Sequence, residues 1–201
     1  MPKRKHQIPS GGPEATARAL ERVDAARSVV LVEGLSDELA LDALGRLRGV
    51  DLEAERVAIL PIGGAHAVGR FAARFPHARV GGLCDAGEQD LFRRAGIADD
   101  ALFVCRRDLE DELIRAHGPD RIELLLEENG DLRAFRTFQK QPAWRGRPPA
   151  DQLRRFLTSA DRRKLRYARI LVTALDPAVA PEPLGAALDY ALSPGVTTPA
   201  S

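Results

Sequence analysis

The stretch that decides the fold is SVVLVEGLSDELAL, residues 28–41. Its first five residues, 28–32, are apolar and mostly β-branched, which predicts a short buried strand. Glu33 and Gly34 end that strand, and Ser36 can cap a helix that we expect to run to about Leu47. A buried strand followed at once by a helix is the repeating unit of a parallel sheet.

The same pattern of a short apolar strand followed by a helix occurs three more times. The connections are short, and glycine or an acidic residue lies at or just after the end of each strand. The expected strands cover residues 57–62, 79–84 and 101–105, with helices reaching about residue 75 after the second strand and residue 94 after the third. Strands that alternate with helices form parallel sheets covered on both faces. The sequence therefore predicts an α/β fold with a parallel four-stranded sheet flanked by helices.

The chain divides into four segments by composition. Residues 14–107, which open with a helical pattern over 14–26, form the expected α/β core. Residues 108–193 are predicted to be a helical extension packed on that core, with one break around 141–149. The basic, Ser-, Gly- and Pro-rich residues 1–13 and the last residues, 194–201, are expected to be flexible tails.

Composition sets limits on location and partners. The 201 residues include 30 basic and 29 acidic side chains, a formal net charge of +1, so any phosphate-binding surface must come from local clustering. Cys84 and Cys105 both lie in apolar runs, which predicts buried, reduced thiols in a cytoplasmic protein. No apolar stretch approaches the length needed to cross a membrane, so no membrane partner is expected.

Acidic residues follow the first, third and fourth strands. In an open parallel sheet the carboxyl ends of the strands form one edge, where ligands bind. Crowded carboxylates repel one another, and a set of oxygen ligands suits Mg²⁺ or Mn²⁺. The alternative is that single acids cap the following helices, the favoured interpretation for Asp108. The acids expected at this edge are Glu33, Asp37, Asp85, Asp108 and Glu110.

Several motifs resemble one known family. VLVEGLSDELAL, residues 30–41, resembles the glutamate motif of Toprim domains in the form found in OLD (overcoming lysogenization defect) endonucleases. Further matching segments follow in the expected order: Gly63-Gly64, LCDAGE at 83–88, RRDLEDEL at 106–113 and RRKLRYARIL at 162–171. The resemblance covers roughly residues 28–192. It implies a Toprim, Rossmann-like fold and a metal-dependent phosphodiesterase, a DNA endonuclease or nickase, with RNA as a substrate left open.

The resemblance also implies roles for individual residues. Glu33 would be a metal ligand or the general base, and Asp37 a second ligand. Asp85 would be the first acid of the family's DxD pair, and Glu110 the later acid that completes the metal shell. Lys164 would match the late lysine that steadies charge at the scissile phosphate. The bound ion would be Mg²⁺ or Mn²⁺.

The chain departs from the family pattern at one acid. Gly87 stands where the family has the second aspartate of the DxD pair, and Glu88 follows one residue later. Glu88 either enters the metal site or caps the next helix. If it does not reach the site, a second metal would lose a ligand, and the site would hold one ion or be weakly active. The alternative function, which Gly87 favours, is a catalytically degenerate module that binds metal or nucleic acid without cutting it.

Basic residues near Lys164 suggest a nucleic-acid surface. Arg162, Arg163 and Arg166 are predicted to bind nucleic acid, and a solvated basic helix face is an equally good interpretation. Two further features are open. Trp144, close to Lys140, Arg145 and Arg147, either stacks on a base or anchors a loop. His66 is interpreted as a surface or helix-start residue.

Other classes of function fit less well. OLD nucleases carry an ATPase domain, and this sequence has no GxxxxGK[ST] phosphate loop. A stand-alone form is therefore expected, which leaves room for a separate ATPase subunit as partner. A receiver-like signalling domain is disfavoured because the first strand ends in a single acid followed by glycine, and because Lys164 lies in an expected helix. The sequence gives no oligomeric state.

Overall fold

A computed structural model describes residue 23 and residues 26–194 of the chain. The predicted flexible tail at 1–13, the predicted tail at 194–201 apart from Pro194, and most of the helix expected over 14–26 lie outside the described residues.

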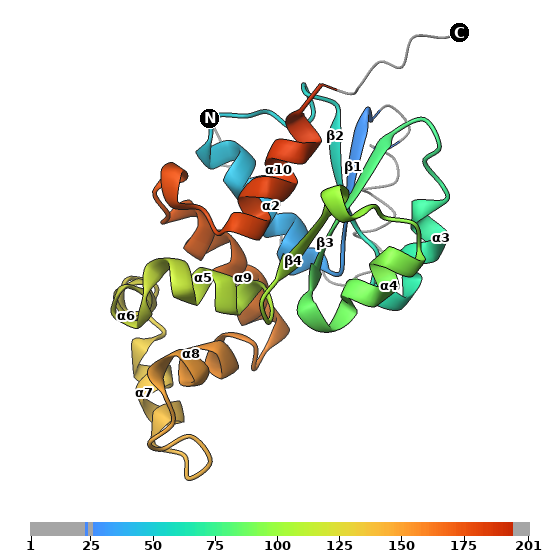
Figure 1. The fold of residues 1–201 in the computed structure, drawn as a ribbon. Helices are drawn as coiled ribbons and strands as arrows, with labels where there is room; N and C mark the ends of the chain where they lie inside the picture. The colour runs from blue at the N-terminus through green and yellow to red at the C-terminus, as the bar shows by residue number, and fades with distance from the viewer. Residues whose placement is uncertain (1–22, 24–25, 195–201) are drawn as a thin grey trace, which may run out of the picture.

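The described chain contains a four-stranded sheet in which every strand is parallel to its neighbours (Figure 1). The strand order is β2-β1-β3-β4. The strands are β1 (Ser28–Val32), β2 (Val57–Pro61), β3 (Arg79–Asp85) and β4 (Leu102–Cys105). These strands confirm the predicted α/β class and all four predicted strands. The sequence signal was clear because each apolar run is long enough for a strand and is bounded by turn residues.

Helices cover both faces of the sheet, as the alternation of side chains requires. Val30 and Val32 of β1 belong to the core beneath α2 (Leu35–Leu47) and α10 (Glu182–Leu192). Val29 and Leu31 point to the other face, covered by α3 (Val68–Ala72) and α4 (Gln89–Arg94) (Figure 1). Successive side chains of a strand point to opposite faces, so one apolar run supplies both cores.

The approach of α4 to the sheet is close enough to require glycine in β3. A Cβ atom added at Gly82 would lie 2.5 Å from the Phe92 ring of α4. Phe92 is fully buried. The absence of a side chain at Gly82 therefore lets this aromatic ring seat directly on the strand.

The second half of the chain is helical, but it has more breaks than the single one predicted. The expected break is present between α7 (Leu132–Gln139) and α8 (Pro149–Leu157). The prediction of an otherwise continuous helical run is wrong, because glycines with positive φ, Gly118 at +74° and Gly130 at +78°, end helices that it joined. The other helices of this half are α5 (Leu109–His117), α6 (Pro119–Glu128), α9 (Asp161–Thr173) and α10.

These later helices share one core with the sheet. Tyr167 and Leu171 of α9 belong to the same buried cluster as Leu41 and Leu44 of α2. The last helix, α10, lies directly on the sheet, with Leu184 and its neighbours in that cluster. The division of the chain at residue 107 stays a prediction. Among the described residues, no helix is long and apolar enough to span a membrane.

Candidate metal centre at the carboxyl edge of the sheet

Two acidic residues meet where neighbouring strands β1 and β3 end. Glu33 follows β1 directly, and Asp85 is the last residue of β3. The backbone N–H of Asp85 donates a hydrogen bond of 2.9 Å to Oε1 of Glu33. The strand order reverses at this point, since β2 lies on one side of β1 and β3 on the other. Such a switch point opens a crevice at the carboxyl ends of the strands, the usual ligand site of open α/β sheets.

Asp37 is held at the same edge by the first turn of α2. Its Oδ2 accepts a hydrogen bond of 3.0 Å from the backbone N–H of Gly34. Burial raises the pKa of Asp37 to about 6, although the positive charge of Lys164 and the Gly34 N–H act in the opposite direction. Asp37 thus couples electrostatically to Lys164, which lies 127 residues later in the chain.

Asp85 is the most strongly perturbed acid of the edge. Burial, followed by repulsion from Glu33, Asp37 and Asp108, raises its pKa to about 8. Burial also raises the pKa of Glu33, and the Asp85 N–H opposes that rise. Carboxyl groups whose pKa values are raised by burial and by like charges are typical of functional sites that await a cation.

Glu110 and Lys164 bring two more helices to the edge. Glu110, in the first turn of α5, is only 4% exposed, and its Oε1 lies 3.8 Å from Nζ of Lys164 on α9. Neither of its carboxylate oxygens has a hydrogen-bond partner in the described chain. Burial raises the pKa of Glu110 to about 7 despite the attraction of Lys164. Buried carboxylate oxygens without hydrogen bonds are rare in proteins, so these are candidates for an additional ligand.

Asp108 caps α5, as the favoured interpretation of the sequence predicted, and also makes an ion pair that sequence reasoning missed. Its Oδ1 accepts a hydrogen bond of 2.9 Å from the N–H of Asp111. Its Oδ2 accepts a hydrogen bond of 2.6 Å from Nε of Arg154 on α8. No local pattern reveals this pair, because the two residues are 46 positions apart.

The segment that departs from the family pattern still contributes a carboxylate. Glu88 lies at the end of the short 3₁₀ turn Ala86–Glu88. Its negative charge helps to raise the pKa of Glu33, so the two carboxylates lie close enough to repel each other. Gly87 is exposed, and a Cβ atom added to it would meet open space.

The loop after β2 presents backbone to the edge. Gly63 and Gly64 both have positive φ, at +75° and +110°, which a residue with a side chain rarely adopts. The N–H of Gly64 donates a hydrogen bond of 2.9 Å to the backbone oxygen of Glu33. His66, on the next turn, is exposed, as the sequence predicted.

The structure places the three arginines around Lys164 in different surroundings. Arg162 is exposed. Arg163 lies over the Phe156 ring at 4.0 Å and donates to the Phe156 backbone oxygen. Arg166 donates to Asp131 and to the Asn129 backbone oxygen, each at 2.8 Å. Two of the three thus have contacts within the fold, and their nucleic-acid role stays a prediction.

The acidic edge fits a divalent cation by its donors and its charge. Glu33, Asp37, Asp85 and Glu110 supply only oxygen donors, and each has a raised pKa. Such donors match Mg²⁺ and Mn²⁺. Over the described residues, however, no three His, Cys, Asp or Glu groups converge closely enough to form a ready-made metal site. The site therefore has the right chemistry, and its side chains would have to close around an ion.

The raised pKa values predict how metal changes stability with pH. An unfolded chain releases these protons near a pKa of about 4, whereas folded Glu110 and Asp85 keep theirs to about 7 and about 8. Between about pH 4 and pH 8, the metal-free folded state therefore binds more protons than the unfolded state. These groups therefore lower the free energy of unfolding as pH rises from about 4 to about 8.

A bound cation neutralises the repelling carboxylates, so the stabilisation by Mg²⁺ should grow over the same pH range. The measurement is the thermal unfolding midpoint with saturating Mg²⁺ and with a chelator, at pH 5 to pH 8. A constant difference between the two conditions would contradict the assignment of these groups to a cation site.

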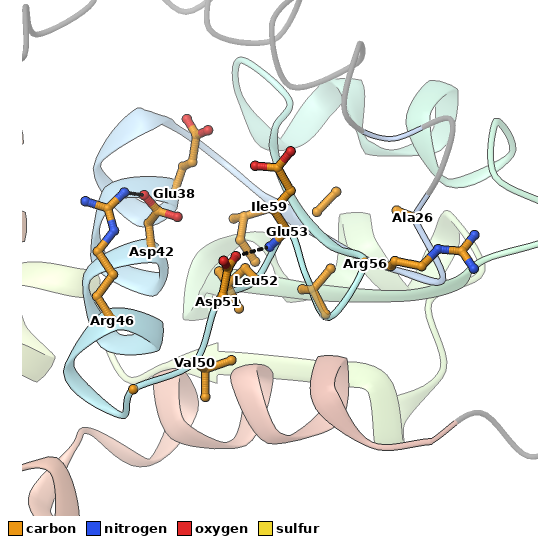
Figure 2. Close-up of a pocket in the computed structure, with 13 residues that line it drawn as sticks. Ala26, Glu38, Asp42, Arg46, Val50, Asp51, Leu52, Glu53, Arg56 and Ile59 are labelled. Atoms are coloured by element: carbon orange, nitrogen blue, oxygen red, sulfur yellow. Dashed lines mark hydrogen bonds and ion pairs between the residues drawn. The ribbon is translucent and has the colours of Figure 1, made fainter.

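A separate hollow lies beside the edge strand β2 (Figure 2). Its volume is about 710 Å³, and its wall includes Glu38 and Asp42 of α2 and the loop residues Asp51 and Glu53. Arg46 also lines it and pairs with Asp42 at 2.6 Å. None of the acids at the carboxyl edge lines this hollow, so it is separate from the candidate metal centre.

Comparisons with known proteins agree with this architecture. Residues 26–80 match the family model "Overcoming lysogenization defect protein-like, TOPRIM domain". The C-terminal region of the Burkholderia pseudomallei OLD protein superposes with a TM-score of 0.59 and 16% identity, over 83% of this chain and 96% of that one. The corresponding region of the Xanthomonas campestris pv. campestris OLD protein gives 0.60 and 19%, over 85% and 94%. A search of curated proteins found no match. The family model confirms the predicted resemblance over residues 26–80, and the superpositions confirm the fold.

Proposed function

We propose, on the premise that this chain carries an OLD-like Toprim domain, that it is a metal-dependent phosphodiesterase that nicks or cuts DNA. One observation carries the proposal: Lys164 of α9 lies 3.8 Å from Glu110 of α5, and the charges of Asp37, Asp85 and Asp108 also act on it at the carboxyl edge of the sheet. Burial lowers the pKa of Lys164, but attraction to Glu110, Asp37, Asp85 and Asp108 outweighs it, so the pKa is raised. A lysine that stays charged among carboxylates suits a site for phosphate and cations.

The residues that would hold Mg²⁺ or Mn²⁺ are Glu33, Asp37, Asp85 and Glu110. When bound, the ion would polarise the phosphodiester and lower the pKa of water. Where Glu33 is not itself a ligand, it is suited to accept a proton, because burial raises its pKa while the Asp85 N–H fixes its orientation. Lys164 is suited to contact a phosphate oxygen, and Glu110 holds it toward the edge at 3.8 Å.

Glu88 is the proposed substitute for the second acid of the DxD pair. It follows the exposed Gly87 and lies close enough to Glu33 to raise its pKa. A carboxylate one residue later, on a longer side chain, keeps a negative charge at this corner of the site. This arrangement supports activity with an altered ligand set.

Restoring the family acid with Gly87→Asp is expected to increase Mn²⁺-dependent nicking about tenfold, since one well-placed shell residue typically changes metal affinity or activity by about 10- to 100-fold. The position tolerates a side chain, because an added Cβ meets open space. Plasmid nicking rates measure the effect, with Gly87→Asn as a control of equal size and no charge. An equal gain in both variants, or none with aspartate, would mean that an acid at position 87 adds no ligand to the site.

A second candidate function is a degenerate module that binds metal or nucleic acid without cleaving it. Two observations favour it: Gly87 replaces an acid, and no three metal-donor groups converge within the described part of the chain. Nicking that appears in Gly87→Asp but not in the wild-type chain would support this second function.

The proposal extends to partners and location. DNA is the proposed substrate, and a separate ATPase subunit is a proposed partner, by analogy with the domain composition of OLD nucleases. The free, buried thiols of Cys84 and Cys105 support a reducing cytoplasmic location.

The test of the proposed function is plasmid nicking with Mg²⁺ or Mn²⁺, beside a Glu33→Ala protein purified identically. The wild-type chain is expected to convert supercoiled DNA to nicked or linear forms, and the variant to leave it intact. A chelator should stop the wild-type reaction. Equal cleavage by both proteins would reveal a contaminating nuclease, and complete inactivity of both would favour the degenerate module.

A further inference from the structure

A marked excess of basic residues lies in α7, α8 and the loop between them, residues 132–157, which we call the basic arm. Seven of its 26 residues are Lys or Arg and one is acidic, a formal net charge of +6 where the whole chain carries +1. Figure 1 shows α7, α8 and their loop at the bottom of the view, away from α10 and the C-terminus. Although the net charge of the whole chain is close to zero, one end of the molecule is therefore strongly basic.

The charges at the tip of the basic arm are open to solvent. Lys140, Arg145 and Arg147 are all exposed in the loop that joins α7 to α8. Elsewhere in the arm, Arg136 pairs with Glu123 of α6 at 2.6 Å, and Arg154 pairs with Asp108. The tip residues thus differ from Arg136 and Arg154, whose charges are already compensated within the fold.

The loop that carries these charges is held in place from inside. The Trp144 ring stacks on the Phe138 ring at 5.2 Å, and Phe138 packs against Phe156 at 5.7 Å. The Gln152 side chain donates 2.8 Å to the Trp144 backbone oxygen. The aromatic rings are therefore used as the core of the arm, and the loop-anchor interpretation of Trp144 is the one the structure favours. An ordered loop loses less conformational entropy when it binds a partner.

The arm is connected directly to the acidic edge. Asp151 and Arg154 of α8 pair with Arg107 at 3.0 Å and with Asp108, the residues that follow β4. Arg147 is four residues before Asp151, a chain length of at most about 14 Å. A turn of B-DNA extends about 34 Å, so one duplex could contact both the tip and the edge.

We propose that the basic arm is a DNA-binding surface that holds the phosphate backbone of a duplex beside the acidic edge. This inference rests on the proposed function and names the surface that retains its substrate. Proteins that bind single strands stack bases on exposed aromatic rings, whereas exposed Lys and Arg side chains alone suit the phosphate backbone of a duplex. At the tip of the arm the Lys and Arg side chains are exposed, and the Trp144 ring packs on the Phe138 ring. The arm would also offset the repulsion between DNA and the carboxylates of the edge.

The test is duplex DNA binding in a chelator, where metal-dependent cleavage cannot occur. A triple variant, Lys140→Ala, Arg145→Ala and Arg147→Ala, is compared with a control that loses the same charge elsewhere: Arg70→Ala, Arg74→Ala and Arg94→Ala. The three control arginines are exposed and lie on or just after α3 and α4. Fluorescence anisotropy with a short labelled DNA duplex gives the Kd at several salt concentrations, and thermal unfolding shows whether each variant stays folded.

The arm variant is expected to raise Kd at least about tenfold at 0.1 M salt and to lower the slope of log K against log salt by about 3, one for each phosphate that the variant no longer neutralises. The control should bind as the wild-type chain does. Unchanged binding by the arm variant, an equal loss in both variants, or tighter wild-type binding to a single strand or an RNA duplex would each overturn the proposal. Because metal is absent, the expected result can appear even if the chain never cuts DNA. If the arm variant both nicked and bound DNA normally, the proposed function would stand, and the assignment of DNA binding to the basic arm would be wrong.

Discussion

Replacing Asp85 with asparagine is expected to abolish metal-dependent cleavage and, at the same time, to stabilise the metal-free protein. Asp85 is partly buried, and this burial together with the charges of Glu33, Asp37 and Asp108 raises its pKa to about 8. An amide of the same size removes the repulsion and the cost of burying a charge. Its side chain is also a much poorer ligand for Mg²⁺ or Mn²⁺ than a carboxylate.

The magnitude follows from the position of Asp85 at the centre of the edge. Loss of a residue that only supports a metal ligand costs about 10- to 100-fold, so loss of a proposed ligand should lower nicking at least about 100-fold. The metal-free unfolding midpoint should rise, and its increase with Mg²⁺ should disappear. The backbone N–H of Asp85 that donates to Glu33 is unaffected by the substitution.

Asp90→Asn on α4 is the matched control for Asp85→Asn, because the Asp90 side chain is 83% exposed. The control should leave both activity and stability unchanged. If Asp85→Asn destabilised the metal-free protein while its activity stayed normal, Asp85 would be a structural residue and the site would be elsewhere.

The second large effect is expected for Lys164→Met, which keeps the apolar stem of the side chain and removes its charge. Lys164 lies 3.8 Å from a carboxylate that is 5% exposed and has no hydrogen-bond partner in the described chain. Without Lys164, Glu110 must either bury an uncompensated charge or stay protonated. Loss of a positioned charge at a reacting phosphate typically lowers the rate by about 100- to 1,000-fold, and a fall of that size is expected in nicking.

Lys164→Met should also lower stability at high pH. Removal of one partner of a buried pair costs about 3–5 kcal/mol, but the Lys164 side chain is 38% exposed, so about 1–2 kcal/mol at pH 8 is the appropriate scale. The loss should shrink toward pH 5, where the neutral Glu110 carboxyl needs no partner. Denaturant unfolding at both pH values measures it, with the exposed Arg169→Met of the same helix as control. A loss that is equal at both pH values would show a packing effect instead of a charge effect.

The fold was predictable because its signals are local. Each strand is a short apolar run bounded by turn residues, and Glu33 and Asp85 follow such runs directly. The rule that parallel strands end at one edge then brings the two acids together without any coordinates. The same reasoning placed Glu110 after the fourth strand, and the family resemblance added Lys164.

What the sequence could not predict depends on contacts between distant residues. The Arg154–Asp108 pair joins positions 46 residues apart, and the Arg166–Asp131 pair joins positions 35 apart. Both pairs place an arginine in a helix whose own pattern suggests only a solvated basic face. The position of α10 on the sheet is a further example, because its apolar face specifies burial but not the surface that it covers.

The central claim, that the acidic edge binds a divalent cation, is tested most directly by calorimetric titration of the metal-free chain with Mn²⁺. The wild-type chain should show saturable binding with release of protons, because the carboxyl groups with raised pKa values must ionise to act as ligands. The same titration of Asp85→Asn should show binding greatly weakened, and Asp90→Asn should bind as the wild type does. No binding by the wild-type chain, or identical binding by Asp85→Asn, would contradict the assignment of a metal centre to this edge.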